Sequence, residues 1–459
     1  MTLNISPHIF RAYDIRGLYN EDLSPQIMYK IGAAFGTYVK KILEGEEVVV
    51  GNDVRNSSIP LAYSLIAGIL SAGISVTFAG TSAFGQTLYA GWDLKTDAIA
   101  YITGSHLPPE WNGIKFYHSE GVGYSEEELQ QIRNYAINDD CINVNWKDLG
   151  DVKGIDSKIK YREFFSKKFT FTKNIKVALD CGGGSTTLSA PEIFKDLGLD
   201  VVPIYCETDP TFSGRPSDPK PKNLGELVNA VKEQSCNFGV AFDGDGDRAV
   251  IVDNTGKVLS ADETGILIGK YGLSQKTGTI IVNVECSKAI GEQLEPLGYK
   301  IKQIPVGHTF LTIEAKQENS PLGIESSGHI IITEYFLFDD ALVTPLKIAE
   351  ILNREENTLS NLVEGIPTYP LHKEEIECSD RTKFDVVEAL KTELSENYEN
   401  LSTLDGVRIN LEKGWVLIRP SNTSPIIRMT IEADDEDAIL QMKSEFTNRV
   451  SKILEKMKG

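Results

Sequence analysis

Short apolar runs alternate with helical stretches over most of this chain, and this alternation limits the folds that it can adopt. Residues 47–50 form a β-branched run, residues 58–71 a helical stretch, and residues 74–78 and 98–102 two further apolar runs. Strands that alternate with helices along a sequence form βαβ units, whose strands lie mainly parallel. The first third of the chain therefore predicts an α/β domain.

The alternation returns twice before the pattern changes near residue 373. From there, apolar runs follow one another directly, and a charged helix closes the chain from residue 435. Successive strands with few helices are typical of an α+β domain. We predict three related α/β domains with mixed or parallel sheets and a smaller C-terminal α+β domain. The predicted boundaries are 1–150, 151–256, 257–368 and 369–459.

Composition narrows the class of partner. The formal net charge of −20 argues against a nucleic-acid or membrane partner, because both attract basic surfaces. A small anionic ligand stays compatible with it, since a local basic pocket can lie in an acidic surface. The six cysteines form no C-x-x-C pair, which is typical of reduced thiols. Without a signal peptide or a long apolar run, the sequence predicts a cytoplasmic protein, either a monomer or a homodimer.

The strongest chemical signal is the segment Asp243-Gly244-Asp245-Gly246-Asp247-Arg248, which follows the predicted strand 238–242. Three carboxylates at alternate positions can converge on one hard divalent cation, and the glycines permit the sharp backbone path. An EF-hand does not fit, because Arg248 and Asn254 stand where that loop needs Gly and Glu. A metal loop is favoured over the simpler alternative, an acidic surface turn, because so many like charges repel one another.

A second signal is Thr103-Gly104-Ser105-His106, after the predicted strand 98–102, with Lys115 downstream. A serine on a tight loop beside a histidine and a lysine can act as a nucleophile or carry a phosphoryl group. On chemistry alone, a serine that hydrogen-bonds its own turn is the stronger interpretation. The absence of a G-x-S-x-G elbow argues against an acyl hydrolase.

Two weaker signals follow in the last third of the chain. Glu325 and Ser327, in the segment 323–329, can bind neighbouring sugar hydroxyls, although a capped helix start explains them about equally well. The segment 419–425, with Arg428 beyond it, joins two predicted strands and packs an arginine and three hydroxyl residues into one turn. Guanidinium and hydroxyl groups together form phosphate sites, so this turn predicts phosphate binding.

In this order, the four segments resemble the α-D-phosphohexomutase family. Asp243 to Arg248 matches the family's D-G-D-G-D-R, and residues 103–108 resemble its T-A-S-H-N-P. Residues 325–329 are similar to its G-E-M-S-G-H, and residues 419–425 match R-x-S-[GN]-T-x-P. Residues 10–17 also resemble the family's opening segment. The chain departs from the family pattern where Gly104 replaces alanine, where Leu107-Pro108-Pro109 replaces Asn-Pro and where Ser326 replaces methionine.

The resemblance implies three α/β domains and an α+β domain around a central cleft, with one loop from each domain facing it. It implies a phosphate carried on Ser105 and one Mg²⁺ held by Asp243, Asp245, Asp247 and the phosphorylated Ser105. The other implied catalytic residues are Lys115, the first candidate for the general base, and His106, Arg248, His308 and His329. The implied substrate-binding residues are Tyr13, Arg16, Glu325, Ser327, Arg419, Ser421, Asn422, Thr423 and Arg428.

The implied activity is an intramolecular phosphotransferase that interconverts hexose 1-phosphate and hexose 6-phosphate, of mannose, glucose or both. Small sugar phosphates would be its partners, and a hexose 1,6-bisphosphate its intermediate and activator. Phosphoglucosamine mutase ranks second, because its members usually carry Gly-Asp where this chain has Gly307-His308. A non-catalytic sugar-phosphate-binding protein on the same scaffold is the alternative of another class. A haloacid-dehalogenase-type phosphatase lacks support, because D-x-D-x-[TV] is not completed at Asp243.

Overall fold

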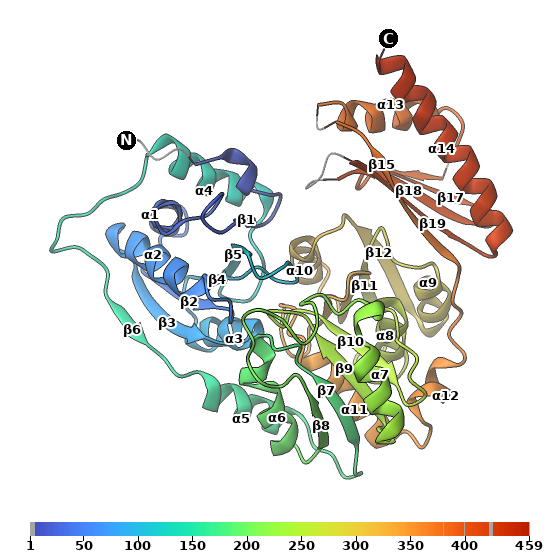
Figure 1. Ribbon diagram of the computed structural model, residues 1–459, viewed down its shortest axis with the longest axis horizontal. Coiled ribbons are helices and arrows are strands. Elements are labelled where there is room, and N and C mark those ends of the chain that lie inside the picture. The colour runs from blue at the N-terminus through green and yellow to red at the C-terminus, as the bar shows by residue number, and fades with distance from the viewer. Residues whose placement is uncertain (1–4, 380, 399, 422–425, 459) are drawn as a thin grey trace.

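The computed structural model describes residues 5–379, 381–398, 400–421 and 426–458 and contains four sheets, one in each of four domains (Figure 1). The first three sheets contain parallel pairs and are covered by helices, and the fourth is antiparallel throughout. The predicted fold class, three α/β domains followed by a smaller α+β domain, is therefore confirmed.

The first domain has a six-stranded sheet in the order β1-β5-β4-β2-β3-β6. Its inner strands are parallel, whereas β5 runs antiparallel to both β4 and β1. Its strands are β1 (Ile15–Leu18), β2 (Glu47–Asn52), β3 (Ser75–Thr81), β4 (Ala98–Ile102), β5 (Trp111–His118) and β6 (Val152–Gly154). Its helices are η1 (Pro7–Ile9), α1 (Pro25–Lys41), α2 (Ser58–Ser71), α3 (Phe84–Leu94) and α4 (Glu126–Asn138).

Strand β6 lies just beyond the predicted boundary at residue 150. It pairs in parallel with β3, with Val76 opposite Val152, so the first sheet continues past residue 150. The prediction ended the domain at the Gly- and Asp-containing stretch that begins at residue 150, but the chain returns to the sheet edge before it enters the second domain. All three predicted boundaries between domains stay predictions.

The second domain has a four-stranded sheet in the order β10-β9-β7-β8. Its strands are β7 (Lys176–Asp180), β8 (Asp200–Ile204), β9 (Phe238–Phe242) and β10 (Ala249–Asp253). Its helices are α5 (Lys158–Lys168), η2 (Ser185–Leu188), α6 (Ala190–Asp196), η3 (Pro221–Asn223) and α7 (Gly225–Glu233). Strands β9 and β10 are antiparallel, with Phe242 opposite Ala249, so the acidic segment 243–248 is the turn that joins them.

The third domain has a four-stranded sheet in the order β12-β11-β13-β14. Its strands are β11 (Gly278–Asn283), β12 (Tyr299–Ile304), β13 (Leu322–Ile324) and β14 (Ile330–Ile332). Its helices are α8 (Ala261–Leu267), η4 (Ile268–Gly272), α9 (Ala289–Leu294), η5 (Glu295–Leu297), α10 (His308–Gln317), α11 (Val343–Arg354) and α12 (Leu359–Val363). The sugar-loop candidates, Glu325 and Ser327, lie in the turn between β13 and β14.

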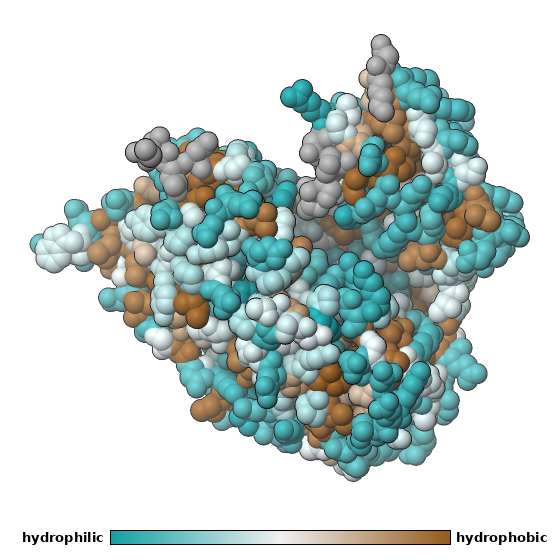
Figure 2. All heavy atoms as spheres, in the orientation of Figure 1, coloured by the Kyte–Doolittle hydropathy of each residue, from teal (hydrophilic) through white to brown (hydrophobic). Residues whose placement is uncertain are grey.

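The C-terminal domain has a five-stranded antiparallel sheet in the order β15-β19-β18-β17-β16, with the long helix α14 packed against it (Figure 1). Its elements are β15 (Leu371–Glu377), α13 (Lys383–Ser395), β16 (Leu401–Ser402), β17 (Val407–Leu411), β18 (Gly414–Pro420), β19 (Ile426–Ala433) and α14 (Glu436–Lys458). Figure 2 shows a notch in the molecular surface between this domain and the first.

One hydrophobic cluster joins the first three domains, in addition to separate clusters within each of them, whereas the fourth domain has a core of its own. The shared cluster joins Phe84 of α3 with Phe165 of α5 and Phe338 of the third domain. The C-terminal cluster contains only residues beyond 370 among its buried members. A smaller cluster of Trp415, Leu417 and Val284 attaches it to the third domain. In the described part of the chain, no helix is long and apolar enough to cross a membrane.

Asp340 lies where the first three domains meet. Tyr161 of α5 donates a hydrogen bond of 2.7 Å to its Oδ2, and the backbone N–H of Leu342 donates one of 3.0 Å to its Oδ1. Gly85 of α3 approaches so closely that a Cβ there would lie 2.4 Å from the carboxyl carbon. Burial raises the pKa of Asp340 to about 7. This carboxyl group therefore holds its proton more tightly in the folded protein than in the unfolded chain.

We expect Asp340→Asn to gain stability relative to the wild type as the pH rises. The unfolded carboxyl group loses its proton near pH 3.9. The folded one keeps it to about pH 7, so the wild type loses stability across that interval and asparagine does not. Urea unfolding of both proteins at about pH 5 and about pH 8 measures the difference. A free-energy difference that is the same at both pH values would contradict this account.

Candidate active site

Ser105 lies on a strained turn directly after β4. Its φ angle is +49°, a left-handed conformation that L-residues rarely adopt and that is often found at functional sites. Its backbone N–H donates a hydrogen bond of 2.7 Å to Oγ1 of Thr103, and its Oγ lies 3.3 Å from Nδ1 of His106. The conformation of the turn, together with the side-chain rotamer, therefore fixes the position of the hydroxyl group.

The buried side chain of Arg55 stabilises this turn through hydrogen bonds. Its Nη2 donates hydrogen bonds to the carbonyl oxygens of Ser105, at 2.8 Å, and Leu107, at 2.6 Å. Its Nε donates one of 3.0 Å to Oδ2 of Asp53, which also accepts the N–H of Gly104 at 3.1 Å. An ion pair buried to this degree holds its position only when such hydrogen bonds complete it. Arg55 and Asp53 are thus positioning residues for the serine turn.

The acidic turn between β9 and β10 folds around its first aspartate. Oδ1 of Asp243 accepts the N–H groups of Gly246, at 3.0 Å, and Asp247, at 3.2 Å. Asp243, Asp245 and Asp247 each offer one oxygen, and these oxygens lie within 4.8 Å of one another. Oδ1 of Asp245 and Oδ1 of Asp247 are buried and accept no hydrogen bond from the described residues. Three converging buried carboxylates, two of which have an oxygen that accepts no hydrogen bond from the described residues, fit a divalent cation such as Mg²⁺.

The serine turn and the acidic turn are in direct contact. Oγ1 of Thr103 donates a hydrogen bond of 3.0 Å to Oδ2 of Asp245. A Cβ at Gly244 would lie 2.5 Å from the carbonyl oxygen of Ser105, so only glycine permits this approach. The structure therefore brings the predicted nucleophile and the predicted metal loop into one site.

Cations from two domains surround the three carboxylates. Lys115 of β5 contacts Asp247 through its Nζ, which also lies 3.2 Å from Oδ2 of Asp245. Nε of Arg248 lies 3.2 Å from Oδ2 of Asp243. Burial alone would raise the pKa of Asp247, but Lys115 and the nearby histidine ring hold it well below its usual range. Lys115 and Arg248 thus neutralise part of the negative charge of the three carboxylates.

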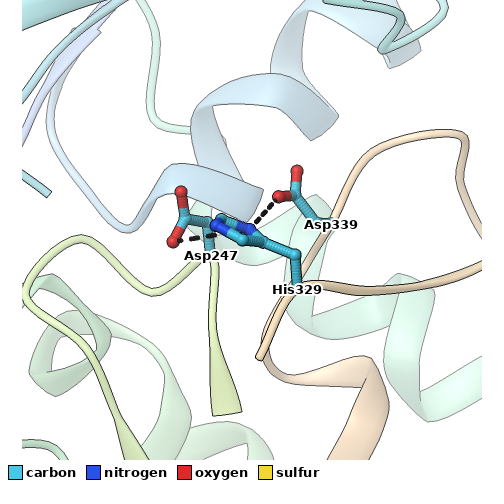
Figure 3. A group of neighbouring side chains, drawn as sticks. All are labelled: Asp247, His329 and Asp339. Atoms are coloured by element: carbon cyan, nitrogen blue, oxygen red, sulfur yellow. Dashed lines mark hydrogen bonds and ion pairs between the residues drawn. The ribbon is translucent and has the colours of Figure 1, made fainter. Parts of the chain in front are cut away.

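His329 connects this centre to the third domain (Figure 3). Its ring lies between Asp339, which pairs with Nδ1, and Asp247, whose Oδ1 is 3.9 Å from the same nitrogen. Although burial lowers the pKa of His329, the two carboxylates raise it to about 9. His308 stacks on His329 at 5.3 Å between ring centroids, and burial lowers its pKa to about 4. The two rings therefore differ in charge near neutral pH.

The remaining sugar-loop candidates lie close to these rings. Glu325 is buried, and its Oε1 accepts a hydrogen bond of 2.8 Å from the exposed Ser327. Its Oε2 is buried and has no hydrogen-bond partner among the described residues. Tyr13 meets His308 edge to face at 5.2 Å, and Arg16 pairs with Asp14 at 2.8 Å. Glu325 thus has an acceptor atom that no described residue uses.

The phosphate-site candidates of the C-terminal domain lie on β18 and β19. Arg419 and Arg428 stand directly opposite one another in these antiparallel strands. Like charges at such positions repel, and anions offset that repulsion. Oε1 of Glu285, in the third domain, lies 3.0 Å from Nη2 of Arg419. Ser421 is buried at the end of β18. Asn422 and Thr423 lie outside the described residues.

Three residues of this site were missed by sequence reasoning. Asp53 and Arg55 follow directly after the carboxyl end of β2, the edge where ligands bind in α/β sheets, and that position was the available signal. Asp339 had no comparable signal, because it becomes a partner of His329 only through the chain path after β14.

Comparison with known proteins agrees with this geometry. Four models for phosphoglucomutase/phosphomannomutase match in order: the alpha/beta/alpha domains I, II and III at residues 7–141, 159–256 and 260–369, and the C-terminal domain at 375–449. A phosphomannomutase/phosphoglucomutase of Pseudomonas aeruginosa is 33% identical over 450 residues, which cover 97% of this chain and 96% of the relative. The chain belongs to the α-D-phosphohexomutase family.

Other phosphohexomutases show that similarity alone leaves the substrate open. A probable phosphoglucosamine mutase of Methanopyrus kandleri is 32% identical over 455 residues, 98% of this chain and 99% of the relative. The crystal structure of a phosphoglucomutase/phosphomannomutase family protein from Burkholderia thailandensis matches with a TM-score of 0.89, 27% identity and 98% coverage of both chains. The fold and the mutase family are therefore shared among enzymes that are named for different sugars.

We expect Gly104→Ala to disturb the serine turn, even though alanine is usual in the family. A Cβ at this position would lie 2.5 Å from Cζ of Arg55 and 2.7 Å from the carbonyl oxygen of Trp111. Overpacking of this kind typically costs about 1–3 kcal/mol. Gly154→Ala on β6 is the matched control, because nothing lies within 4 Å of its added Cβ. Thermal unfolding and the mutase rate of both variants measure the effect, and equal behaviour would contradict it.

Removal of one carboxylate should weaken metal binding without unfolding the protein. We expect Asp245→Asn to lower the affinity for Mn²⁺, used as a spectroscopic probe for Mg²⁺, by roughly tenfold or more. Electron paramagnetic resonance of free Mn²⁺ measures it, with Asp196→Asn, a surface residue paired with Arg162, as control. Unchanged Mn²⁺ binding in Asp245→Asn would exclude the acidic turn as the metal site.

Proposed function

We propose that this chain is a phosphohexomutase that moves a phosphoryl group between O1 and O6 of a hexose phosphate by way of Ser105. The observation that carries the proposal is the contact between the serine turn and the three-carboxylate turn, through the 3.0 Å hydrogen bond from Thr103 to Asp245. A phosphate on Ser105 would lie beside a divalent cation and two buried cations of the protein, Lys115 and Arg248. This is the environment that phosphoryl transfer needs.

The proposed reaction has two halves that mirror each other. In the first, the bond between phosphorus and Oγ of Ser105 breaks, a bond to the free sugar hydroxyl forms, and the hydroxyl proton passes to a base. The product is a hexose 1,6-bisphosphate, which turns end over end. In the second, the other phosphate passes to Ser105 and the proton returns to the sugar oxygen. Mg²⁺ bound by Asp243, Asp245 and Asp247 would supply neutralisation of charge on the phosphoryl oxygens.

Lys115 is the first candidate for the proton transfer, with His308 and His329 next. Although burial lowers the pKa of Lys115, Asp245 and Asp247 outweigh that effect and raise it, so Lys115 would start from its protonated form. Its Nζ lies against the carboxylates of the acidic turn, next to the serine turn, so a hydroxyl group that approaches Ser105 comes close to it. His308 is a neutral imidazole near neutral pH and can accept a proton, since burial lowers its pKa to about 4. His106, which faces Oγ of Ser105 at 3.3 Å, would orient the phosphoryl group.

The other end of the substrate would bind across the third and fourth domains. Glu325 and Ser327 would hold sugar hydroxyl groups, since the buried Oε2 of Glu325 lacks a partner. The paired Arg419 and Arg428, with Ser421 and the neighbouring Asn422 and Thr423, would hold the phosphate that is not being transferred. Tyr13 and Arg16 would line the part of the substrate site that the first domain provides. We extend this proposal to one Mg²⁺ per active site, with the bisphosphate as activator.

A neutral hexose fits this site better than an amino sugar. His308 stands where phosphoglucosamine mutases usually carry an aspartate, and its ring is held between Tyr13 and His329. Burial keeps this ring neutral near pH 7, so it offers no anion to a protonated amino group. Glucose and mannose phosphates are therefore the proposed substrates, and glucosamine phosphate is the second candidate.

Ser105→Ala should abolish mutase turnover, because the variant lacks the hydroxyl group that carries the phosphoryl group. The protein should stay folded. We expect the wild type to lose the mass of one phosphate on treatment with a phosphatase, and the loss to map to Ser105. Ser64→Ala, on helix α2, is the control for a lost hydroxyl group. A Ser105→Ala variant with near-wild-type turnover would refute the mechanism, and a folded wild type without any turnover would favour the sugar-phosphate-binding alternative.

Substrate preference is tested by initial rates on glucose 1-phosphate, mannose 1-phosphate and glucosamine 1-phosphate. We expect kcat/KM for at least one neutral sugar to exceed that for glucosamine 1-phosphate by tenfold or more, which corresponds to about 1.4 kcal/mol. His308→Asp should narrow this ratio, because it restores an anion beside the amino group. A wild-type preference for glucosamine 1-phosphate would reassign the enzyme.

A further inference from the structure

Two cysteines lie side by side behind the metal loop, and the proposed mechanism uses neither. Cys181 follows β7 and Cys206 follows β8, two parallel strands that pair up to Asp180 and Ile204. Their sulfur atoms are 3.4 Å apart. A disulfide bond requires about 2.05 Å, so a small movement of the two side chains would allow one to form.

The two thiols differ in their access to solvent. Cys206 is half-buried and lines an open surface cavity of about 580 Å³ together with Gly182, Tyr205 and Asp209. Cys181 is fully buried beneath it and does not line this cavity. The interaction with the Cys181 sulfur lowers the pKa of Cys206, whereas burial raises the pKa of Cys181 well above its usual value. Cys206 is therefore the thiol that a reagent would meet first.

The backbone beside Cys181 supports the acidic turn directly. The carbonyl oxygen of Cys181 accepts the N–H of Gly184 at 2.9 Å, and the next N–H, that of Ser185, donates to the carbonyl oxygen of Gly244 at 2.9 Å. A Cβ at Gly184 would lie 2.7 Å from the same carbonyl oxygen, so the two turns pack without free space. A change in the position of Cys181 therefore reaches Gly244, between two of the metal-binding aspartates.

We propose that Cys181 and Cys206 are a redox-sensitive thiol pair, and that their disulfide bond displaces the acidic turn and weakens metal binding. A peroxide would supply the oxidising equivalents. Cys206 gives up its proton, its thiolate attacks one peroxide oxygen, and the O–O bond breaks. Cys206 becomes a sulfenic acid, and the hydroxide that leaves takes up the proton from Cys206 to form water. The Cys181 sulfur then attacks Cys206, the S–S bond forms, and a second water leaves with the Cys181 proton. Two thiols are oxidised and one peroxide is reduced.

The charge around the cavity favours a small neutral oxidant. Glu207 and Asp209 line it together with Cys206. These carboxylates would repel an anionic disulfide such as oxidised glutathione, whereas hydrogen peroxide is uncharged and fits any opening that admits water. Hydrogen peroxide is therefore the probe of choice.

The test uses the full-length protein and two readouts that do not depend on sugar turnover. After treatment with hydrogen peroxide, we expect the intact mass to fall by two hydrogen atoms and one peptide pair, containing Cys181 and Cys206, to be cross-linked. Binding of Mn²⁺, followed by electron paramagnetic resonance, should weaken several-fold and return to its initial value after dithiothreitol. Mutase activity, where present, should fall and recover in parallel.

Single variants identify the order of events. Cys206→Ser should resist both the cross-link and the loss of Mn²⁺ binding, whereas Cys181→Ser should stop at a sulfenic acid that dimedone traps on Cys206. Cys141→Ser is the matched control, because Cys141 is also half-buried and lines a cavity. It should respond to peroxide as the wild type does.

Three results would overturn the proposal. The first is oxidation of the wild type that yields no peptide pair between Cys181 and Cys206. The second is a cross-linked protein that binds Mn²⁺ as tightly as the reduced one. The third is a Cys206→Ser variant that loses Mn²⁺ binding as the wild type does. Failure of the mutase assay alone would instead bear on the proposed function, because Mn²⁺ binding and the cross-link are measured without substrate.

Discussion

The mutual repulsion of three buried carboxylates is the constraint that shapes the rest of this structure. Their nearest oxygens lie within 4.8 Å of one another, and at an effective dielectric constant of 20 each pair of full charges at that separation repels by about 3 kcal/mol. Backbone N–H groups stabilise Asp243, and Lys115 and Arg248 supply two positive charges. Two oxygens nevertheless remain without a hydrogen-bond partner in the described part of the chain, which is why a bound cation is expected there.

The groups that offset this repulsion come from different domains, so the acidic turn also joins them. Thr103 and Lys115 approach it from the first domain, and His329 from the third. The backbone contributes as well, because the N–H of Phe84 donates to the carbonyl oxygen of Asp245 at 3.0 Å. A change in the charge of this turn would therefore affect the packing of three domains, and the shared hydrophobic core beneath them keeps the site in register.

The sequence predicted a strand or helix correctly where that element's own residues show a clear apolar or helical pattern. The predicted runs 58–71, 98–102 and 238–242 coincide with α2, β4 and β9 in the structure. Strand β5 was not predicted, because Asn112, Gly113 and Lys115 interrupt its apolar pattern and it is a strand through its pairing with β4 and β1. Likewise, the acidic turn could be located from its spacing, but its contact with the serine turn depends on two sheets meeting. Local periodicity holds no information about that contact.

Strand β6 has a practical consequence for work on isolated parts of this protein. It occupies the outer side of β3, whose backbone N–H and C=O groups would otherwise face solvent at the end of the first sheet. An expression fragment cut after residue 150 would leave that edge open, and open edges recruit strands from other molecules. Fragments of the first domain should therefore extend beyond Gly154, or association through the bare edge will obscure whatever the fragment is made to measure.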